Sequence, residues 1–288
     1  MAPKLIATAI EALPVCCPAM SGQVAIVTGA SRGIGRGVAV GLGEAGWTVY
    51  ITARTVRDGE SDRPGSITKT AEQVTRAGGR GIPMRADHSV DSETEGIFRR
   101  VEDEQGRLDL LVNNATSYST DLGPREDAMF WDLPVEEWDQ MHAVGLRSHY
   151  IASACASRMM VSRRSGLMVN ISSIGAIKYT GNVSYNVVKA AVDMLTLSTA
   201  EELRPHKVAV VSFWPRLTRT EALIAHPGQF SDPSKAWSAE FNGRCVAALA
   251  NDPRIIEKSG EALDLAEVAI EYGLADSDSR VPERRPRA

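Results

Sequence analysis

Cysteine is scarce in this chain of 288 residues, which contains only Cys16, Cys17, Cys155 and Cys245. Their spacing matches neither a zinc site nor a disulfide framework, so we expect no metal site and a reducing compartment, the cytoplasm. Long hydrophobic runs are also missing. No apolar stretch has the length needed to cross a bilayer, and we therefore expect no membrane span.

An excess of either charge is missing as well. The 32 Lys and Arg residues nearly balance the 36 Asp and Glu residues, giving a net charge of −4. Such a balance gives no reason to expect a nucleic-acid partner. The hydrophobic content of 43% and charged content of 24% are typical of a soluble globular protein whose length suits a single α/β domain.

The two ends of the chain differ in composition from its middle. Residues 1–20 contain Pro14 and Pro18 and lack the flanks of a secretory signal, so we predict a disordered N-terminal extension. Residues 277–288 are charged and proline-rich, which predicts a solvated tail. Residues 21–276 show no repeat and no internal boundary, and we predict that they form one domain.

Apolar runs of strand length alternate with helical stretches along the chain. This alternation predicts an α/β fold of the Rossmann type, a doubly wound parallel sheet of about seven strands with helices on both faces. We expect strands at 24–28, 48–52, 81–84, 108–112, 166–171, 208–213 and 261–265. We expect helices at 34–45, up to about 77, and at 91–104, 135–161, 183–203 and 243–250.

A glycine-rich turn follows the first expected strand. Gly29, Gly33 and Gly35 have the spacing G-x-x-x-G-x-G. Glycines at a strand-to-helix turn let the backbone approach a pyrophosphate, and the N-terminus of the next helix can bind it. Because glycines alone are a weak signal, a merely tight turn is the alternative.

Polar residues follow several of the other expected strands. They are Asp87, Asn113-Asn114-Ala115, Ser172-Ser173 and the run from Pro215 to Thr220. Each segment alone is ordinary turn chemistry. Ligands of open α/β sheets, however, bind at the carboxyl ends of the strands, so we expect these segments to line one crevice.

Tyr185 and Lys189 are four residues apart in a stretch expected to be helical. This spacing puts both side chains on one helix face. An ammonium beside a phenol favours the phenolate, which would lower the pKa of Tyr185 from about 10 toward neutrality. Such a tyrosine can exchange a proton with an alcohol or a carbonyl. The alternative is an ordinary surface pair.

Taken together, these segments resemble the short-chain dehydrogenase/reductase family over residues 21–265. The resemblance is carried by the runs 28–35 and 113–115, by Ser172-Ser173, and by Tyr185 with Lys189. The runs 144–150 and 213–215 further resemble the branch typified by dehydrogenase/reductase family member 1. That branch is regarded as reducing steroid and xenobiotic carbonyls with NADPH.

The resemblance implies a catalytic role for each matching residue. Tyr185 would be the general acid/base, Lys189 would lower its pKa and bind the nicotinamide ribose, and a serine would hydrogen-bond the substrate oxygen. The family's spacing to the tyrosine, about thirteen residues, selects Ser172. Gap-free alignment of the preceding strand selects Ser173. Because adjacent strand residues point to opposite faces, the two cannot serve equally, and we favour Ser172 while keeping both.

The resemblance also implies which residues contact a nicotinamide cofactor. They are Gly29, Ser31, Arg32, Gly33, Ile34, Gly35, Arg54, Asp87, Asn113, Ala115, Tyr185, Lys189, Pro215 and Thr220. Arg54 follows the second expected strand, where an acidic residue would repel a 2′-phosphate. The guanidinium groups of Arg32 and Arg54, with no carboxylate beside them, favour NADP(H) over NAD(H). The alternative is that Arg54 is only a solvated surface residue.

Two positions depart from the family pattern. Gly145 stands where many members have Asn, whose main-chain carbonyl holds a water in a proton relay, and glycine retains that carbonyl. Arg216 stands where a glycine usually follows the proline. Three consequences of Arg216 stay open: backbone strain, contact with the cofactor diphosphate, and contact with an acidic substrate.

The long segments 116–134 and 221–242 are expected to form a substrate mouth. Their aromatic residues suit an apolar carbonyl compound, although they could equally serve to anchor the loops. We therefore predict an NADP(H)-dependent oxidoreductase that interconverts a small-molecule carbonyl and its alcohol. The alternatives are a cofactor-binding regulatory or interaction protein with little turnover, and a sugar-nucleotide epimerase, which would need a larger C-terminal domain. We expect a homodimer or homotetramer that pairs through the two long helices.

Overall fold

The computed structural model describes residues 22–117, 129–225 and 232–284. Its centre is a single sheet of seven strands in the order β3-β2-β1-β4-β5-β6-β7. The strands are β1 (Val24–Thr28), β2 (Thr48–Ala53), β3 (Arg80–Arg85), β4 (Leu110–Asn113), β5 (Gly166–Ile171), β6 (Val208–Trp214) and β7 (Ala262–Asp264). All neighbours pair in parallel, which confirms the predicted fold class.

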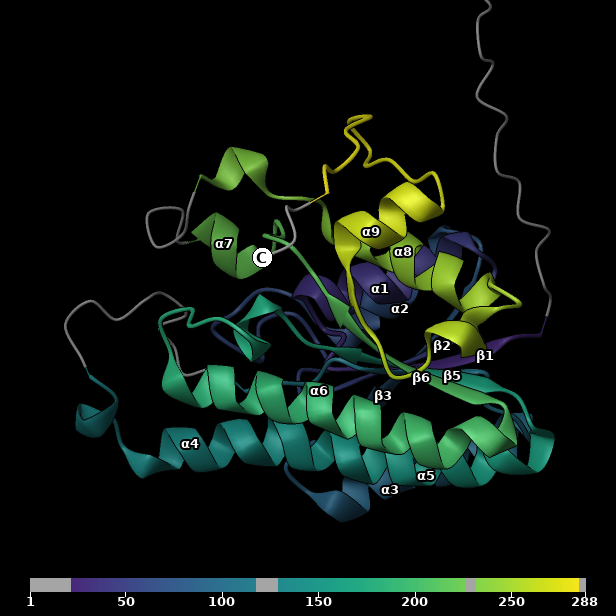
Figure 1. Ribbon diagram of the computed structural model, residues 1–288. Helices are drawn as coiled ribbons and strands as arrows, with labels where there is room; N and C mark the ends of the chain where they lie inside the picture. Colours follow the sequence, from purple (N-terminus) through teal and green to yellow (C-terminus); the bar gives the residue numbers. More distant parts are fainter. Residues whose placement is uncertain (1–21, 118–128, 226–231, 285–288) are drawn as a thin grey trace, which may run out of the picture.

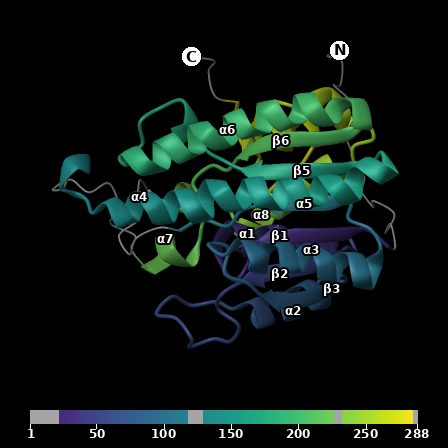
Figure 2. The ribbon, with the colours of Figure 1, turned by 90° about the horizontal axis from the view of Figure 1, so that it is seen from below.

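Helices cover both faces of the sheet (Figures 1 and 2). One face packs against α1 (Gly33–Glu44), α2 (Ile67–Arg76), α8 (Ala239–Asn251) and α9 (Leu265–Glu271). The other face packs against α3 (Asp91–Gln105), α5 (Ser148–Arg163) and α6 (Val183–Leu203). Because both faces are covered, strands such as β1 are continuous apolar runs that are buried along their whole length.

The strand order reverses between β1 and β4, which lie side by side at the centre of the sheet. Ligands of open α/β sheets bind beyond the carboxyl ends of the strands at such a point. The glycine-rich turn after β1 and the Asn-Asn-Ala segment after β4 meet here. The short helix α7 (Glu221–Ala225) lies at the same end of the molecule as the start of α6 (Figure 1).

The predicted elements agree closely with the observed ones. The bounds of β1, β5 and α6 are as predicted. The predicted helix 135–161 contains three parts, α4 (Val135–His142), a π-helical segment (Ala143–Arg147) and α5. Helix α8 begins four residues earlier than predicted because Ser238 caps it, its hydroxyl accepting a hydrogen bond from the Phe241 N–H. None of the helices in the described ranges is long and apolar enough to cross a membrane.

Helices α1 and α8 pack backbone to backbone because glycines line their contact. A Cβ atom added at Gly37 would lie 2.0 Å from the carbonyl oxygen of Ala239. One added at Gly41 would lie 2.5 Å from the carbonyl carbon of Gly243. This close approach fixes the position of α1, whose N-terminus forms part of the candidate site.

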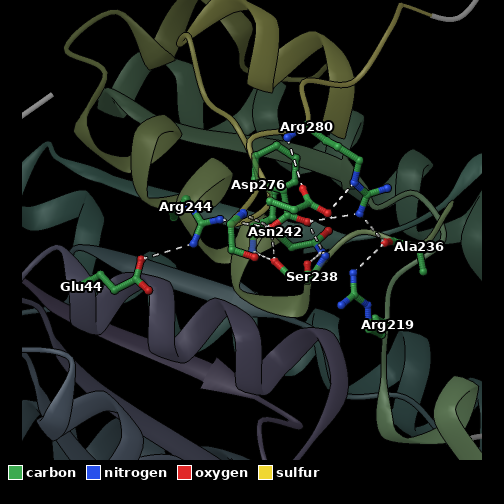
Figure 3. Close-up of polar contacts among 11 residues, drawn as sticks. Glu44, Arg219, Ala236, Ser238, Asn242, Arg244, Asp276 and Arg280 are labelled. Atoms are coloured by element: carbon green, nitrogen blue, oxygen red, sulfur yellow. Dashed lines mark hydrogen bonds and ion pairs between the residues drawn. The ribbon is translucent and has the colours of Figure 1, made fainter. Parts of the chain in front are cut away.

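A polar cluster around Asp276 joins the C-terminal segment to the start of α8 (Figure 3). The buried Asp276 carboxylate accepts hydrogen bonds from the Ser238 N–H at 2.8 Å and from Arg244 at 3.3 Å. Arg280 donates to the Ala236 carbonyl at 3.0 Å, and its guanidinium lies 4.7 Å from the centre of the Trp237 ring. The predicted boundary between residues 276 and 277 therefore falls inside a segment that contacts the domain.

We predict opposite effects for two glycine-to-alanine substitutions in helices. Gly37→Ala should lower the free energy of unfolding by about 1–3 kcal/mol, because the added methyl meets the backbone of α8. Gly96→Ala in α3 should raise it by about 0.5–1 kcal/mol, since the nearest atom to its methyl is the end of the Arg99 side chain at 3.7 Å. Urea unfolding measures both, and equal effects would contradict the packing described.

Candidate active site

The glycine-rich turn lies directly against the end of β4. Gly29 and Gly33 adopt positive φ values of 66° and 60°, which a side chain would strain. A Cβ atom at Gly29 would lie 2.7 Å from the Cα of Ala115, and one at Gly35 would lie 2.4 Å from Nδ2 of Asn114. These glycines therefore let the turn pack directly against the end of β4, where the helix α1 begins.

Thr28 and Asn114 lock the ends of β1 and β4 together. The Thr28 hydroxyl oxygen accepts from the backbone N–H groups of Asn114 at 2.9 Å and Ala115 at 3.0 Å. The Asn114 side chain donates to the carbonyls of Thr28 at 2.8 Å and Gly29 at 3.1 Å. Asn114 was expected only as part of a segment that lines the crevice, although the tendency of Asn to bind nearby backbone groups could have suggested this role.

Asn113 lies beneath the crevice and not in its wall. Its completely buried amide donates to Asn170 at 2.9 Å and to Ser153 of α5 at 3.0 Å. The side chain is directed into the layer between the sheet and α5. The prediction that Asn113 lines the cofactor crevice therefore applies only to its backbone.

A row of buried polar side chains joins α6 to the sheet at this point. Asn113, Asn170 and Ser212 are register neighbours on β4, β5 and β6. Asn170 donates to the Thr196 hydroxyl of α6 at 2.8 Å, and this hydroxyl lies 2.9 Å from that of Ser212. Each bond forms only in one register, so the row fixes α6 along its axis.

Lys189 is buried at the centre of the candidate site. Its side chain is 4% exposed, and Nζ donates to the carbonyl of Ile171, the last residue of β5, at 2.7 Å. The same Nζ lies 5.6 Å from the centre of the Tyr185 ring. Burial lowers the pKa of Lys189 to about 8, while the negative charge of Asp193 raises it. The predicted pair thus places a cation beside a phenol in a poorly solvated position.

The two serines after β5 lie in different surroundings. Ser172 is buried, and its hydroxyl donates to the backbone carbonyl of Lys189 at 3.3 Å. The Ser173 hydroxyl accepts from the Gly175 N–H at 3.0 Å. A Cβ atom at Gly175 would lie 2.8 Å from that hydroxyl and 2.9 Å from Cε1 of Tyr185.

The Ser173 hydroxyl and the Tyr185 ring therefore both lie next to Gly175, whereas the Ser172 hydroxyl bonds to the backbone of α6. Our preference for Ser172 came from a fixed spacing to the tyrosine. The chain turns at Ser173 into a short 3₁₀ helix, Ile174–Ala176, so spacing along the sequence does not by itself distinguish the two serines.

Three arginines gather beside the end of β2. Arg32 donates to the Thr55 hydroxyl and to the Gly65 carbonyl, both at 3.1 Å. Burial and the positive charges of Arg63 and Arg54 lower the pKa of Arg32. Arg54 is largely exposed, and its guanidinium is 4.0 Å from the carboxylate of Asp87. Arg63 was not predicted, because it reaches the cluster from a loop whose conformation the sequence does not reveal.

Glu221 joins the loop after β6 to the glycine-rich turn. Its carboxylate accepts from the Gly33 N–H at 2.7 Å and pairs with Arg36 at 3.0 Å. The methyl group of the predicted Thr220 is 3.6 Å from a Cβ position at Gly33. Glu221 was not predicted. Because helix N-termini favour negatively charged groups, a carboxylate near the start of α1 could have been expected.

Arg216 is directed away from the crevice. Its guanidinium pairs with Asp264 of β7 at 2.9 Å, and both side chains are mostly buried. Among the described residues other than glycine, only Arg164, Lys207 and Ser279 have positive φ, so Arg216 causes no strain of that kind. The ion pair answers the question left open by the sequence, because Arg216 joins the segment after Pro215 to the edge of the sheet.

Gly145 lies in the π-helical segment, where it allows α6 to approach. A Cβ atom there would lie 3.1 Å from Val188 and 3.4 Å from the Thr116 hydroxyl. One turn later, the buried His149 bonds through Nε2 to the carbonyl of Ala115 at 2.9 Å. Burial lowers the pKa of His149 to about 3, so its ring is neutral. No role was predicted for this histidine, although it belongs to the run 144–150 that carries the resemblance to one branch of the family.

The remaining predicted residues surround this crevice. Ser31 is buried, and its carbonyl lies 2.6 Å from a Cβ position at Gly65. Ile34 packs partly buried against the core. Among the aromatics expected at the substrate mouth, Tyr118 and Phe230 lie outside the described residues. Trp237 packs on Phe241, with ring centres 5.3 Å apart, so it serves the core.

Comparison with known proteins assigns the chain to a class of enzyme. The family model for short chain dehydrogenases matches residues 23–227. The chain therefore belongs to the short-chain dehydrogenase/reductase family, and it is an oxidoreductase of that family. The predicted resemblance is confirmed.

Curated relatives place it near one branch of that family. The chain is 43% identical over 275 residues to human dehydrogenase/reductase SDR family member 1. The alignment covers 91% of this chain and 85% of the human protein. The mouse protein of the same name matches equally well over 274 residues, again with 91% and 85% coverage. A 3-oxoacyl-acyl-carrier-protein reductase of Synechocystis is 28% identical, covering 86% of this chain and 96% of the relative.

Solved structures agree with this assignment. A metagenomic short-chain oxidoreductase in complex with NADP has a TM-score of 0.66 at 31% identity, covering 81% of this chain and 93% of that one. A putative dehydrogenase from Xanthomonas campestris has a TM-score of 0.78 at 25% identity, with coverages of 91% and 94%.

We predict that Thr28→Val destabilises the crevice. Valine keeps the shape of threonine, but it removes the acceptor for the backbone N–H groups of Asn114 and Ala115. The free energy of unfolding should fall by about 1–3 kcal/mol, as measured by urea titration. Thr48→Val, at the other end of the neighbouring strand, serves as the control and should change it by less than about 0.5 kcal/mol. A small effect at both positions would argue against the Thr28 lock.

Proposed function

We propose that this protein interconverts a carbonyl compound and its alcohol with NADP(H), using Ser173, Tyr185 and Lys189. The observation that carries the proposal is the buried ammonium of Lys189 between the Ile171 carbonyl and the Tyr185 ring. A cation in such a position favours the ionised phenol over the neutral one. Membership of an oxidoreductase family supports the same chemistry.

The chain's residues fit a nicotinamide dinucleotide. The glycine-rich turn lies at the N-terminus of α1, where a negatively charged diphosphate is favoured and would take the place of the Glu221 carboxylate on the Gly33 N–H. Beside it, the buried Nε of Arg32 has no hydrogen-bond partner among the described residues. Arg32, Arg54 and Arg63 together would bind a 2′-phosphate, and Lys189 would reach the nicotinamide ribose. When bound, the cofactor supplies or accepts the hydride.

The protein's part of the reaction is a proton transfer. In the reducing direction Tyr185 gives its phenolic proton to the substrate oxygen as the carbonyl carbon gains a hydride. Ser173 donates a hydrogen bond to the same oxygen and steadies it while charge develops. Lys189 stabilises the phenolate that remains. Ser172 has a different role, because its bond to the Lys189 carbonyl orients α6.

The substrate that suits this site is an apolar ketone or aldehyde, of steroid-like or xenobiotic type. Apolar side chains near the mouth are well exposed, with Phe130 at 60%, Trp131 at 68% and Ile224 of α7 at 65%. Apolar walls with a few polar groups are typical of sites for such ligands.

No observation favours the alternative of a protein without turnover. Its support came from Gly145 and Arg216. The close contact with Val188 explains the glycine, and the ion pair with Asp264 explains the arginine.

We further propose a cytoplasmic homodimer or homotetramer that pairs through α5 and α6. Exposed apolar residues on these helices, Tyr150, Met194 and Leu197, support that assembly.

We predict that the two serines differ in their effect on turnover. With NADPH and a panel of steroids, quinones, diketones and 3-oxoacyl thioesters, the protein should oxidise NADPH with at least one compound. On that compound, Ser173→Ala and Tyr185→Phe should each lower kcat about 100-fold or more, because each removes a group that acts on the substrate oxygen.

Ser172→Ala is the matched control and should lower kcat less than about tenfold, since it removes only a bond to the backbone. The reverse order of the serines would overturn their assignment. NADPH binding without oxidation across the panel would instead favour a binding protein.

We predict a large preference for NADPH over NADH in kcat/KM. Three cations beside β2 attract the 2′-phosphate, and each charged hydrogen bond contributes about 1.5–3 kcal/mol. Arg63→Ser should reduce the preference about tenfold while leaving activity with NADH nearly unchanged. Arg76→Ser, on the exposed face of α2, should leave the preference as it is. A preference for NADH in the unaltered protein would contradict the assignment.

A further inference from the structure

Helix α6 carries a second charged residue on the face that bears Tyr185 and Lys189. Asp193 follows Lys189 by four residues, so the two side chains are neighbours one turn apart. Lys189 is buried, whereas Asp193 is partly buried. The tyrosine, the lysine and the aspartate thus form one line along the helix, which leads away from the proposed reaction site.

The carboxylate of Asp193 is held in place by a tryptophan of the sheet. The indole Nε1–H of Trp214 donates to its two oxygens at distances of 3.1 and 3.3 Å. Trp214 is the last residue of β6, directly after Phe213, and Phe213 is the register partner of Ile171 on β5. Ile171 supplies the carbonyl that binds the Lys189 ammonium.

Neighbouring ends of two adjacent strands therefore hold the lysine and the aspartate. This arrangement limits the freedom of both side chains, because each is fixed by a sheet residue. In a partly buried position, a fixed negative charge acts on its neighbour more strongly than one that moves in water.

We propose that Asp193, held by the Trp214 indole, is a positioning residue that keeps the buried Lys189 in its ammonium form. The inference deepens the proposed function and rests on the role given there to Lys189. It assigns a task to two residues that are not among the predicted cofactor contacts.

The charges around Lys189 determine the direction of the effect. Burial lowers the pKa of Lys189 to about 8, and the charge of Asp193 opposes this lowering. The other titratable groups facing the ammonium are Tyr185, on the same helix, and His149 of α5, whose ring is neutral because its pKa is lowered to about 3. Removing the Asp193 charge should therefore let Lys189 lose its proton at a lower pH.

Three substitutions separate charge, hydrogen bond and general surface effects. Asp193→Asn removes the charge but keeps an oxygen that can accept from the indole. Trp214→Phe keeps the charge but removes the donor that fixes it. Glu201→Gln is the matched control on α6, because Glu201 is exposed and pairs with Arg204 instead. Thermal unfolding of each variant shows that it is folded.

The direct test is an NMR titration of protein labelled with ¹³C-lysine, using Lys189→Arg to assign the Lys189 signal. In Asp193→Asn the midpoint should move to lower pH by roughly one pH unit, and in Trp214→Phe by less in the same direction. Glu201→Gln should leave it in place. An unchanged midpoint in folded Asp193→Asn would overturn the inference.

Turnover gives a second readout that separates the inference from the proposed function. The kcat of Asp193→Asn should be within about twofold of the unaltered protein at pH 6 and about five- to tenfold lower at pH 8. If the Lys189 midpoint moves while kcat at pH 8 does not, the inference stands and the proposed role of Lys189 fails. A loss of kcat that is the same at every pH would point to a merely structural role and would overturn the inference.

Discussion

The hydrogen bond between the Lys189 ammonium and the Ile171 carbonyl is the interaction on which the rest of the site depends. A buried cation is costly unless it is paired and hydrogen-bonded. Here a strand carbonyl binds it at 2.7 Å, and an aromatic ring and a carboxylate lie nearby. The burial that makes this charge costly also strengthens its interaction with Tyr185, because little water lies between them to screen it.

The fold maintains that interaction by fixing α6 against the sheet. The polar row of Asn170, Thr196 and Ser212 sets the helix along its axis. Gly145 lets the neighbouring π-helical segment come close to Val188. On the opposite face, the glycine contact between α1 and α8 sets the start of α1. Both halves of the site thus rest on close packing between helices and sheet.

Much of this arrangement could be predicted because it depends on patterns within short stretches of the sequence. Continuous apolar runs identify the buried strands, glycine spacing identifies the turn after β1, and helical spacing identifies Tyr185 with Lys189. The features that escaped prediction depend on contacts between distant segments. Arg63 reaches the site from a loop and Glu221 from the start of α7, and Arg216 is paired with a residue of the last strand.

The serine shows most clearly why local reasoning reaches its limit. Ser172 and Ser173 are adjacent and chemically identical, so only the direction of the chain after β5 distinguishes them. That direction is set by the Ser173 hydroxyl accepting from Gly175, and by the packing of Tyr185 against the same glycine. If the turn began one residue earlier or later, the serine that is buried and the serine beside the tyrosine would change places.

Tyr185 and Lys189 are proposed to act as one unit in proton transfer. The most direct measurement is the rate of hydride transfer, in single turnover, for Tyr185→Phe, Lys189→Met and the double variant. Residues that act as a unit have strongly non-additive effects. The double variant should be about as slow as the slower single variant. Losses that multiply in the double variant would mean that the two residues act independently and would contradict the proposal.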